Sequence, residues 1–264
     1  LQEFYGFRTQ PFNITTDAEL FFESRSHQEA LASLMYGIEE RKGLILITGE
    51  VGTGKTTLCK ALLERLPQSV RTSFIMSPYF SDIQLLQAIV EDFGLEPEKK
   101  TRLDIVKKLD AFLIDLSLNQ GNAVLIIDEA QNLKARQLEQ IRLLSNLETK
   151  HGKLLQIVLV GQPELKASLQ RFDLRQIYQR IVIKYELRPL EAGDVKAYVD
   201  FRIERSGVTG VSIPSEGYRM IHEFSKGVPR LVNLLCDRAL LLGFVKKEKV
   251  LSPEIFIAAM EEIR

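Results

Sequence analysis

A loop rich in glycine, with one lysine and two threonines, is the first feature whose residue types could do chemistry. It reads GEVGTGKTTL over residues 49–58 and follows an apolar run at 44–48. Glycines adopt backbone angles that are closed to other residues, so consecutive N–H groups can turn inward and surround an anion. The spacing G-x-x-x-x-G-K-T, from Gly49 to Thr56, is that of the phosphate-binding P-loop. The pattern predicts a site for a nucleoside triphosphate.

Different residues of this loop are expected to contact the phosphates and to bind the metal ion. Lys55 is expected to reach the β- and γ-phosphates, and the Thr56 hydroxyl is expected to bind Mg²⁺. Residues 44–48 predict a buried strand and 55–66 a helix, whose positive dipole end would point at the phosphates. The alternative is a glycine-rich turn without a ligand. The expected nucleotide-binding residues are Gly49, Glu50, Val51, Gly52, Thr53, Gly54, Lys55, Thr56 and Thr57.

Two carboxylates end a second buried run. The segment AVLIIDEAQNL covers residues 123–133 and places Asp128 and Glu129 at the carboxyl end of a predicted strand. Ligands bind at such ends in open α/β sheets. We expect Asp128 to serve Mg²⁺ and Glu129 to act as the general base toward the attacking water. The alternative is an ordinary strand end with acidic turn residues. A base beside Mg²⁺ favours hydrolysis of ATP over storage.

The rest of the chain predicts the elements that must position these residues. Apolar periodicity indicates helices near 26–38, 83–93, 103–118 and 141–147 and strands near 72–76, 154–161 and 180–187, with Ser26 and Glu29 resembling a capping box at the first helix. Strands that alternate with helices predict a parallel sheet with helices on both faces. After residue 190 the sequence predicts only helices, near 192–205, 215–225, 229–244 and 253–263. We therefore expect an α/β nucleotide domain, with its N-terminal segment, at 1–190 and a small helical domain at 191–264.

Composition narrows the class further. The 264 residues carry 35 basic and 35 acidic side chains, a neutral balance that argues against a dedicated nucleic-acid binder. We find no apolar segment long enough to span a bilayer and no secretory signal. The two cysteines are too few for a disulfide framework, and the three histidines have no metal-binding spacing. A cytoplasmic protein, with Mg²⁺ as its metal, is the expectation.

Taken together, five segments resemble a known family. The P-loop, the D-E strand end and the helical C-terminal part look like an AAA+ ATPase. More narrowly, PFNITTD, GEVGTGKTTL, IIDEAQNL, VLVGQPEL and GVPRLVN resemble the cytosolic ATPase domain of the general secretion pathway protein A family. The resemblance covers nearly all of the chain. It implies a three-layer fold with a parallel sheet of order 5-1-4-3-2, a helical lid domain, and ATP bound between the two domains.

The resemblance also implies roles for residues outside the two motifs. Gln162, after the strand beside the D-E strand, matches the sensor-1 position, although Asn, Thr or Ser is usual there; the alternative is a polar strand end. Arg230 in GVPRLVN matches sensor 2, which contacts the phosphates; the alternative is an exposed arginine at a helix start. Arg175 and Arg180 lie where the family keeps an arginine finger for a neighbouring subunit. Arg180 is the first choice, and a solvated or ion-paired arginine is the alternative for each.

A finger in trans implies a homo-oligomer, and the family implies a role in type II secretion or a related envelope machine. There a transmembrane helix and a periplasmic domain follow the ATPase domain, and neither is visible in these residues, which would be the cytosolic part of a protein associated with the inner membrane. The rival functions are a DNA-transposition helper ATPase, a small-molecule kinase and a nucleotide-gated scaffold with little turnover. The N-terminal PFNITTD and Phe21-Phe22 are expected either to pack on adenine or to cover the core.

Overall fold

The computed structural model describes residues 1–13, 20–99, 101–150, 152–207 and 210–263. The chain forms two compact units, which are described separately. The α/β unit contains Gln28–Glu50 and Leu58–Leu187, and the helical unit contains Leu1–His27, Val51–Thr57 and Arg188–Arg264. The P-loop residues after Glu50 are therefore grouped with the helical unit.

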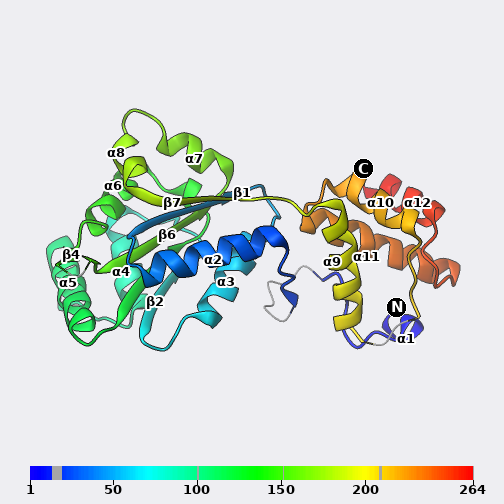
Figure 1. The fold of residues 1–264 in the computed structure, drawn as a ribbon, viewed down its shortest axis with the longest axis horizontal. Coiled ribbons are helices and arrows are strands. Elements are labelled where there is room, and N and C mark those ends of the chain that lie inside the picture. The colour runs from blue at the N-terminus through cyan, green and yellow to red at the C-terminus, as the bar shows by residue number, and fades with distance from the viewer. Residues whose placement is uncertain (14–19, 100, 151, 208–209, 264) are drawn as a thin grey trace. The chain divides into compact units, whose positions relative to one another are not determined.

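A five-stranded sheet forms the middle layer of the α/β unit (Figure 1). Its order is β2-β3-β6-β1-β7, and each neighbouring pair is parallel. Counting only these five strands along the chain gives 5-1-4-3-2, so the predicted sheet is confirmed. The strands are β1 (Leu44–Gly49), β2 (Val70–Ile75), β3 (Asn122–Ile127), β6 (Leu155–Gly161) and β7 (Ile181–Leu187); β4 (Glu148–Thr149) and β5 (Gly152–Lys153) form a separate antiparallel pair.

Helices cover both faces of this sheet. The crossover from β1 to β2 runs in the opposite direction along the sheet to the three that follow, so a right-handed chain must place its helix on the opposite face. That helix is α3 (Lys55–Arg65), which lies with α2 (Arg25–Glu39). The other face carries α4 (Asp82–Asp92), α5 (Arg102–Leu118), α6 (Ala135–Leu144), α7 (Pro163–Leu169) and α8 (Arg175–Arg180).

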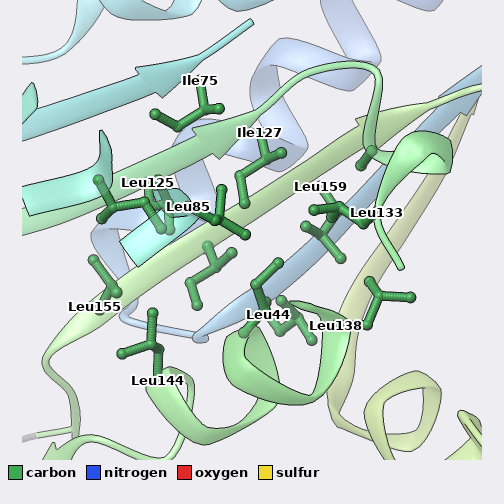
Figure 2. Packing of buried hydrophobic residues seen from close by; sticks show 14 of the residues in the cluster. Leu44, Ile75, Leu85, Leu125, Ile127, Leu133, Leu138, Leu144, Leu155 and Leu159 are labelled. Atoms are coloured by element: carbon green, nitrogen blue, oxygen red, sulfur yellow. The ribbon is translucent and has the colours of Figure 1, made fainter. Parts of the chain in front are cut away.

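Alternation along the buried strands explains these layers. Leu125 and Ile127 of β3, with Leu159 of β6, point toward the face of α4 to α6 and form one aliphatic cluster with them (Figure 2). The residues between them face α2 and α3. At Gly37 of α2 an added Cβ would lie 2.6 Å from the Ile45 Cδ1 atom, so the Ile45 side chain would have to shift to admit any side chain there.

The helical unit has its own core. It is built from α9 (Ala192–Arg205), α10 (Ser215–Ser225), α11 (Pro229–Lys246) and α12 (Pro253–Ile263), together with the short N-terminal α1 (Gln2–Tyr5). Tyr5 is 1% exposed, and its hydroxyl donates to the Leu240 carbonyl at 3.0 Å. Phe12 is buried in the same cluster, and the Arg202 Nε atom donates to the Pro11 carbonyl at 2.6 Å. The N-terminal residues thus belong with the C-terminal helices.

The structure departs from the predictions mainly at short elements and helix starts. The short helices α1, α7 and α8 were not predicted. The helix expected at 141–147 begins at Ala135, where the Lys134 N–H donates to Gln137 Oε1 at 2.8 Å. The helix expected from Ser26 begins at Arg25, and Ser24 Oγ accepts from the His27 N–H at 3.4 Å. The division into domains at residue 190 stays a prediction; the compact units differ from it in placing residues 1–27 and 51–57 with the helices.

Truncating a buried side chain of the sheet should lower the stability of the protein. Leu159 is 0% exposed in β6, so Leu159→Ala should lower the free energy of unfolding by about 2–5 kcal/mol. Leu118→Ala, at a side chain 79% exposed at the end of α5, is the matched control and should change it by less than about 0.5 kcal/mol. Urea unfolding followed by circular dichroism measures both, and equal small changes would contradict the core assigned to β6.

Candidate active site

The phosphate-binding loop joins β1 to α3. Gly52 and Gly54 have φ angles of 82° and 94°, in the left-handed region that favours glycine, as the motif predicts. Gly49 differs: it is the last residue of β1 and is not among the glycines with positive φ, so the prediction of a special backbone angle there was wrong. Thr53 and Lys55 are buried, whereas the Val51 side chain is half exposed.

Within the helical unit, this loop contacts the start of α11. The Arg230 N–H donates to the Gly52 carbonyl at 3.3 Å. An added Cβ at Gly52 would lie 2.7 Å from the Arg230 Cβ atom and 3.2 Å from the Val228 Cγ1 atom, so the close approach requires glycine. The Arg230 residue itself is exposed. The residue that matches sensor 2 is therefore fixed to the loop through its backbone, while its guanidinium remains accessible.

His27 is a residue at this loop that the sequence analysis missed. Its Nε2 atom lies 3.1 Å from the Thr53 carbonyl oxygen, and its Nδ1 atom lies 2.7 Å from Ser24 Oγ. A carbonyl can only accept, so Nε2 carries the proton and Nδ1 accepts from the Ser24 hydroxyl. An added Cβ at Gly54 would lie 2.9 Å from the same Nε2 atom. Only the helix-start position of His27 was visible in the sequence, and nothing there linked it to the loop.

Burial keeps the His27 ring neutral. The residue is 3% exposed, and the edge of the Phe21 ring packs on it with the ring centroids 5.2 Å apart. Desolvation lowers the pKa of His27 from 6.5 to about 4, although the Thr53 hydrogen bond and the carboxylates of Glu23 and Asp194 act in the opposite direction. A neutral ring keeps one donor and one acceptor, which is the pair that Thr53 and Ser24 require.

The acidic end of β3 is a second candidate site, in the α/β unit. Asp128 is 2% exposed, and its Oδ1 atom accepts from the Glu129 N–H at 2.8 Å. Glu129 has φ 51° and ψ 36°, a left-handed conformation that is uncommon for a residue with a side chain. The Asn132 N–H donates to the Glu129 carbonyl at 3.0 Å. The chain therefore turns sharply after β3 and directs the two adjacent carboxylates differently.

Gln162 reaches the same carboxylate. It follows β6 and precedes Pro163, the first residue of α7. Its Nε2 atom lies 3.5 Å from Glu129 Oε2, at the limit of a hydrogen bond. Gln131, to which the sequence analysis gave no role, donates from Nε2 to the same oxygen and accepts the Gln162 N–H at 3.1 Å through Oε1. Its position two residues after Glu129, in the letters DEAQ, is the signal that was available.

Strand register explains why these residues meet. Thr48 of β1 lies opposite Gly161 of β6, and Leu159 of β6 lies opposite Ile127 of β3. Since the strands are parallel, their carboxyl ends share one edge of the sheet. At that edge, Asp128 and Glu129 come directly after β3, and Gln162 comes directly after β6. Glu50 comes directly after β1 at the same edge.

The two candidate finger arginines lie at opposite ends of α8. Arg175 begins the helix, and its guanidinium stacks over the Phe172 ring at 5.3 Å from the centroid. Arg180 ends it. The hydrogen bond from Arg142 is the main cause of the lowered pKa of Glu139, the hydrogen bond from Lys153 is the main cause for Glu148, and the charge of Arg180 adds a smaller contribution to both. Both arginines are exposed. The structure does not bring either of them to Glu129 within the α/β unit, and their role as fingers stays a prediction.

The neighbouring aromatic residues Phe21 and Phe22 pack against different parts of the helical unit. Phe22 packs against Tyr198 and Phe201 of α9, with centroids 5.7 Å away in each case, so it covers the core of the helical unit. Phe21 packs on His27 instead. In the segment PFNITTD, residues 14–17 lie outside the described residues, so the expectation that the segment meets adenine stays a prediction.

The residue types at each of the two candidate sites, taken by themselves, suit a magnesium nucleotide. The loop offers backbone N–H groups at the start of α3 and the Lys55 ammonium, which suit phosphate oxygens. The Thr56 hydroxyl and the Asp128 carboxylate are oxygen ligands of the kind Mg²⁺ takes. Over the described ranges, no three His, Cys, Asp or Glu side chains gather into a metal cluster, and Mg²⁺ held by one or two protein oxygens plus phosphates requires none.

Fold and motifs define a P-loop protein, and comparison with known sequences specifies the family. The AAA domain model matches residues 38–169, half of the chain, so the protein belongs to the AAA domain family. The chain is also 42% identical over 262 residues to general secretion pathway protein A of Aeromonas hydrophila. That match covers 98% of this chain and 48% of the relative, so the chain spans about half the length of the curated protein it matches.

Solved structures share the fold. ORC2 of Aeropyrum pernix, in ADPNP–ADP complexes, superposes with a TM-score of 0.72 at 19% identity, covering 98% of this chain and 72% of that one. Cdc6p of Pyrobaculum aerophilum gives 0.71 at 18% identity, over 96% and 70%. RuvB of Thermotoga maritima, a Holliday junction branch migration motor, gives 0.60 at 22% identity, over 92% and 73%. The predicted resemblance to AAA+ ATPases is thereby confirmed at the level of fold and family.

The low pKa of His27 makes stability depend on pH. Between pH 6.5 and about 4 the unfolded chain binds a proton at this ring that the folded protein does not, so stability falls as the pH is lowered through this window. From pH 7 to 5 the loss through this residue should be about 2 kcal/mol. His27→Asn removes the titration, so its free energy of unfolding relative to wild type should rise by that amount over the same interval.

Urea unfolding at several pH values measures this difference. His27→Gln serves as the internal control: the two substitutions pack differently and should differ in stability at pH 7, but they should share the same change in slope. Parallel pH profiles for wild type and both variants would contradict a neutral His27 in the folded protein.

Proposed function

We propose that this protein binds Mg-ATP, hydrolyses it, and uses the cycle to drive conformational or assembly changes. The observation that carries the proposal is the pairing of a P-loop after β1 with a buried aspartate and an amide-held glutamate after β3. A chain that only stored nucleotide would not need a restrained carboxylate at the strand end. Membership of the AAA domain family and the nucleotide complexes of ORC2, a protein of the same fold, support the nucleotide as substrate.

Nucleotide binding is assigned to the loop. The N–H groups of Gly52 to Thr57 and the dipole of α3 would hold the phosphates, with Lys55 neutralising the β- and γ-phosphate charge. The Arg230 guanidinium would add a bidentate contact to the same phosphates. The Arg230 N–H is hydrogen-bonded to the Gly52 carbonyl, so a change in the loop on nucleotide binding would act directly on the start of α11.

Hydrolysis is assigned to the strand end. Thr56 and Asp128 would hold Mg²⁺, which when bound neutralises charge on the phosphate oxygens. Glu129 would accept a proton from the attacking water, and Gln162 would orient that water or the γ-phosphate. The water oxygen then bonds to the γ-phosphorus as the bond to the β–γ bridging oxygen breaks. An arginine from a neighbouring subunit, Arg180 or Arg175, would stabilise the charge that develops.

The cellular role is proposed from the relative. The match to general secretion pathway protein A supports service to type II secretion or a related envelope machine, with a protein of that machine as partner. We propose a cytoplasmic location for this part of the chain and assembly with further copies of itself. In the described part of the chain, none of the helices combines the length and the apolar character needed to cross a membrane.

Two substitutions separate binding from chemistry. Lys55→Ala should abolish ATP binding in a fluorescent-nucleotide titration, because the phosphate charge loses its main cation. Glu129→Gln should bind Mg-ATP with affinity near that of wild type and hydrolyse it ~10²–10⁴-fold more slowly, since only the base is lost. Wild-type affinity in Lys55→Ala would contradict the assignment of the loop, and wild-type turnover in Glu129→Gln would require another base.

The finger predicts a dependence on protein concentration. If each site needs a neighbour's arginine, turnover per chain should rise with concentration, and Arg180→Ala should flatten the rise by removing ~10³–10⁵ in rate while ATP affinity stays near wild type. Arg171→Ala, at a side chain 69% exposed and paired with Asp173, is the matched control in the same segment and should keep the rise. Arg175→Ala tests the second candidate.

Mixing two inactive proteins completes this test. Lys55→Ala chains still offer an arginine to the intact nucleotide site of an Arg180→Ala chain, so the mixture should recover part of the activity. Turnover that is independent of concentration, together with no recovery on mixing, would mean that a single chain is self-sufficient.

A further inference from the structure

Gln131 uses both ends of its side-chain amide in the α/β unit. Its Nε2 atom donates to Glu129 Oε2, and its Oε1 atom accepts from the Gln162 N–H at 3.1 Å. The orientation of the amide is fixed by its partners, because a carboxylate oxygen accepts and a backbone N–H donates. A reversed amide would lose both bonds. The side chain therefore bridges the ends of β3 and β6 in one defined orientation.

These bonds leave one oxygen of Glu129 available. The side-chain Nε2 atoms of Gln131 and Gln162 both face Glu129 Oε2, and that of Gln162 lies 3.5 Å from it. Among the described residues, none donates a hydrogen bond to Oε1. The left-handed backbone of Glu129 is held as well, through its N–H on Asp128 and its carbonyl on Asn132. The carboxylate is thus restrained at one oxygen while the other can accept a proton.

Gly161 makes room for this bridge. An added Cβ at Gly161 would lie 2.8 Å from Gln131 Oε1 and 3.3 Å from the Gln131 backbone nitrogen. The same atom would lie 2.8 Å from the Leu165 Cδ2 atom. Any side chain at the end of β6 would therefore displace the amide that connects the two strand ends.

From this geometry we infer that Gln131 is a positioning residue: it holds Glu129 as the general base and couples it to the turn that carries Gln162. The inference rests on the proposed hydrolysis. Gln131 takes no proton and contacts no reacting atom. It acts by keeping the Glu129 carboxylate in one place, so that turnover depends on it while nucleotide affinity does not. A small misplacement of a catalytic group can cost on the order of 10² in rate.

The test replaces Gln131 by methionine, which has a similar length and forms neither hydrogen bond. Gln131→Met should lower kcat about 10–100-fold, with the Kd for Mg-ATP within about twofold of wild type. Gln137→Met is the matched control. Gln137 is another glutamine of this unit whose side chain makes two hydrogen bonds, one from the Lys134 N–H at 2.8 Å and one to the Phe80 carbonyl at 3.0 Å, and it is buried whereas Gln131 is partly exposed. Its replacement should lower stability and leave kcat unchanged.

A double substitution distinguishes positioning from general damage. Once the base is removed by Glu129→Gln, adding Gln131→Met should lower kcat by less than about twofold, because residues that act as a unit are not additive. Effects that multiply would overturn the inference, as would a rise in kcat in the single variant. If Glu129→Gln is inactive and Gln131→Met turns over at the wild-type rate, the inference alone fails. If Glu129→Gln keeps wild-type turnover, the proposed base itself fails.

Discussion

Parallel pairing in register, between strands buried on both faces, is the constraint on which the rest of the α/β unit depends. β3, β6 and β1 are nearly continuous aliphatic runs, so a slip of one strand by a residue would leave cavities and clashes on both sides of the sheet. The register aligns their carboxyl ends at one edge. The register alone therefore brings the polar residues that follow these ends close together.

The helical unit holds the phosphate-binding loop by other means. Strand pairing ends at Gly49, and beyond it backbone groups of the loop are bonded by distant parts of the chain. The His27 ring donates a hydrogen bond to the Thr53 carbonyl, and the Arg230 N–H donates one to the Gly52 carbonyl. Two carbonyls of the loop are therefore bonded by other groups. A site for phosphate needs its carbonyls turned away, and these contacts provide for that.

Much of this arrangement could be predicted from the sequence, because periodicity and motif spacing are local signals. The extents of α9, α10 and α12 and the turn glycines Gly52 and Gly54 follow from such signals. The order of the five strands was implied only by the family resemblance. His27 and Gln131 could not be given roles in this way. Their importance comes from partners that the fold brings to them, the Thr53 carbonyl for one and the Gln162 N–H for the other. Helix starts such as Arg25 and Ala135 were missed because a single side-chain cap decides them.

The left-handed backbone of Glu129 has a consequence for how this protein can evolve. A residue with a Cβ in that region carries strain of order 1 kcal/mol, which glycine would relieve and asparagine tolerates well. If Glu129 is the general base proposed above, selection for a more stable fold and selection for a carboxylate therefore oppose each other at position 129. A descendant that no longer needed the carboxylate would be expected to drift toward glycine or asparagine there. Within this lineage, the identity of residue 129 would then serve as a marker of whether the chemistry has been kept.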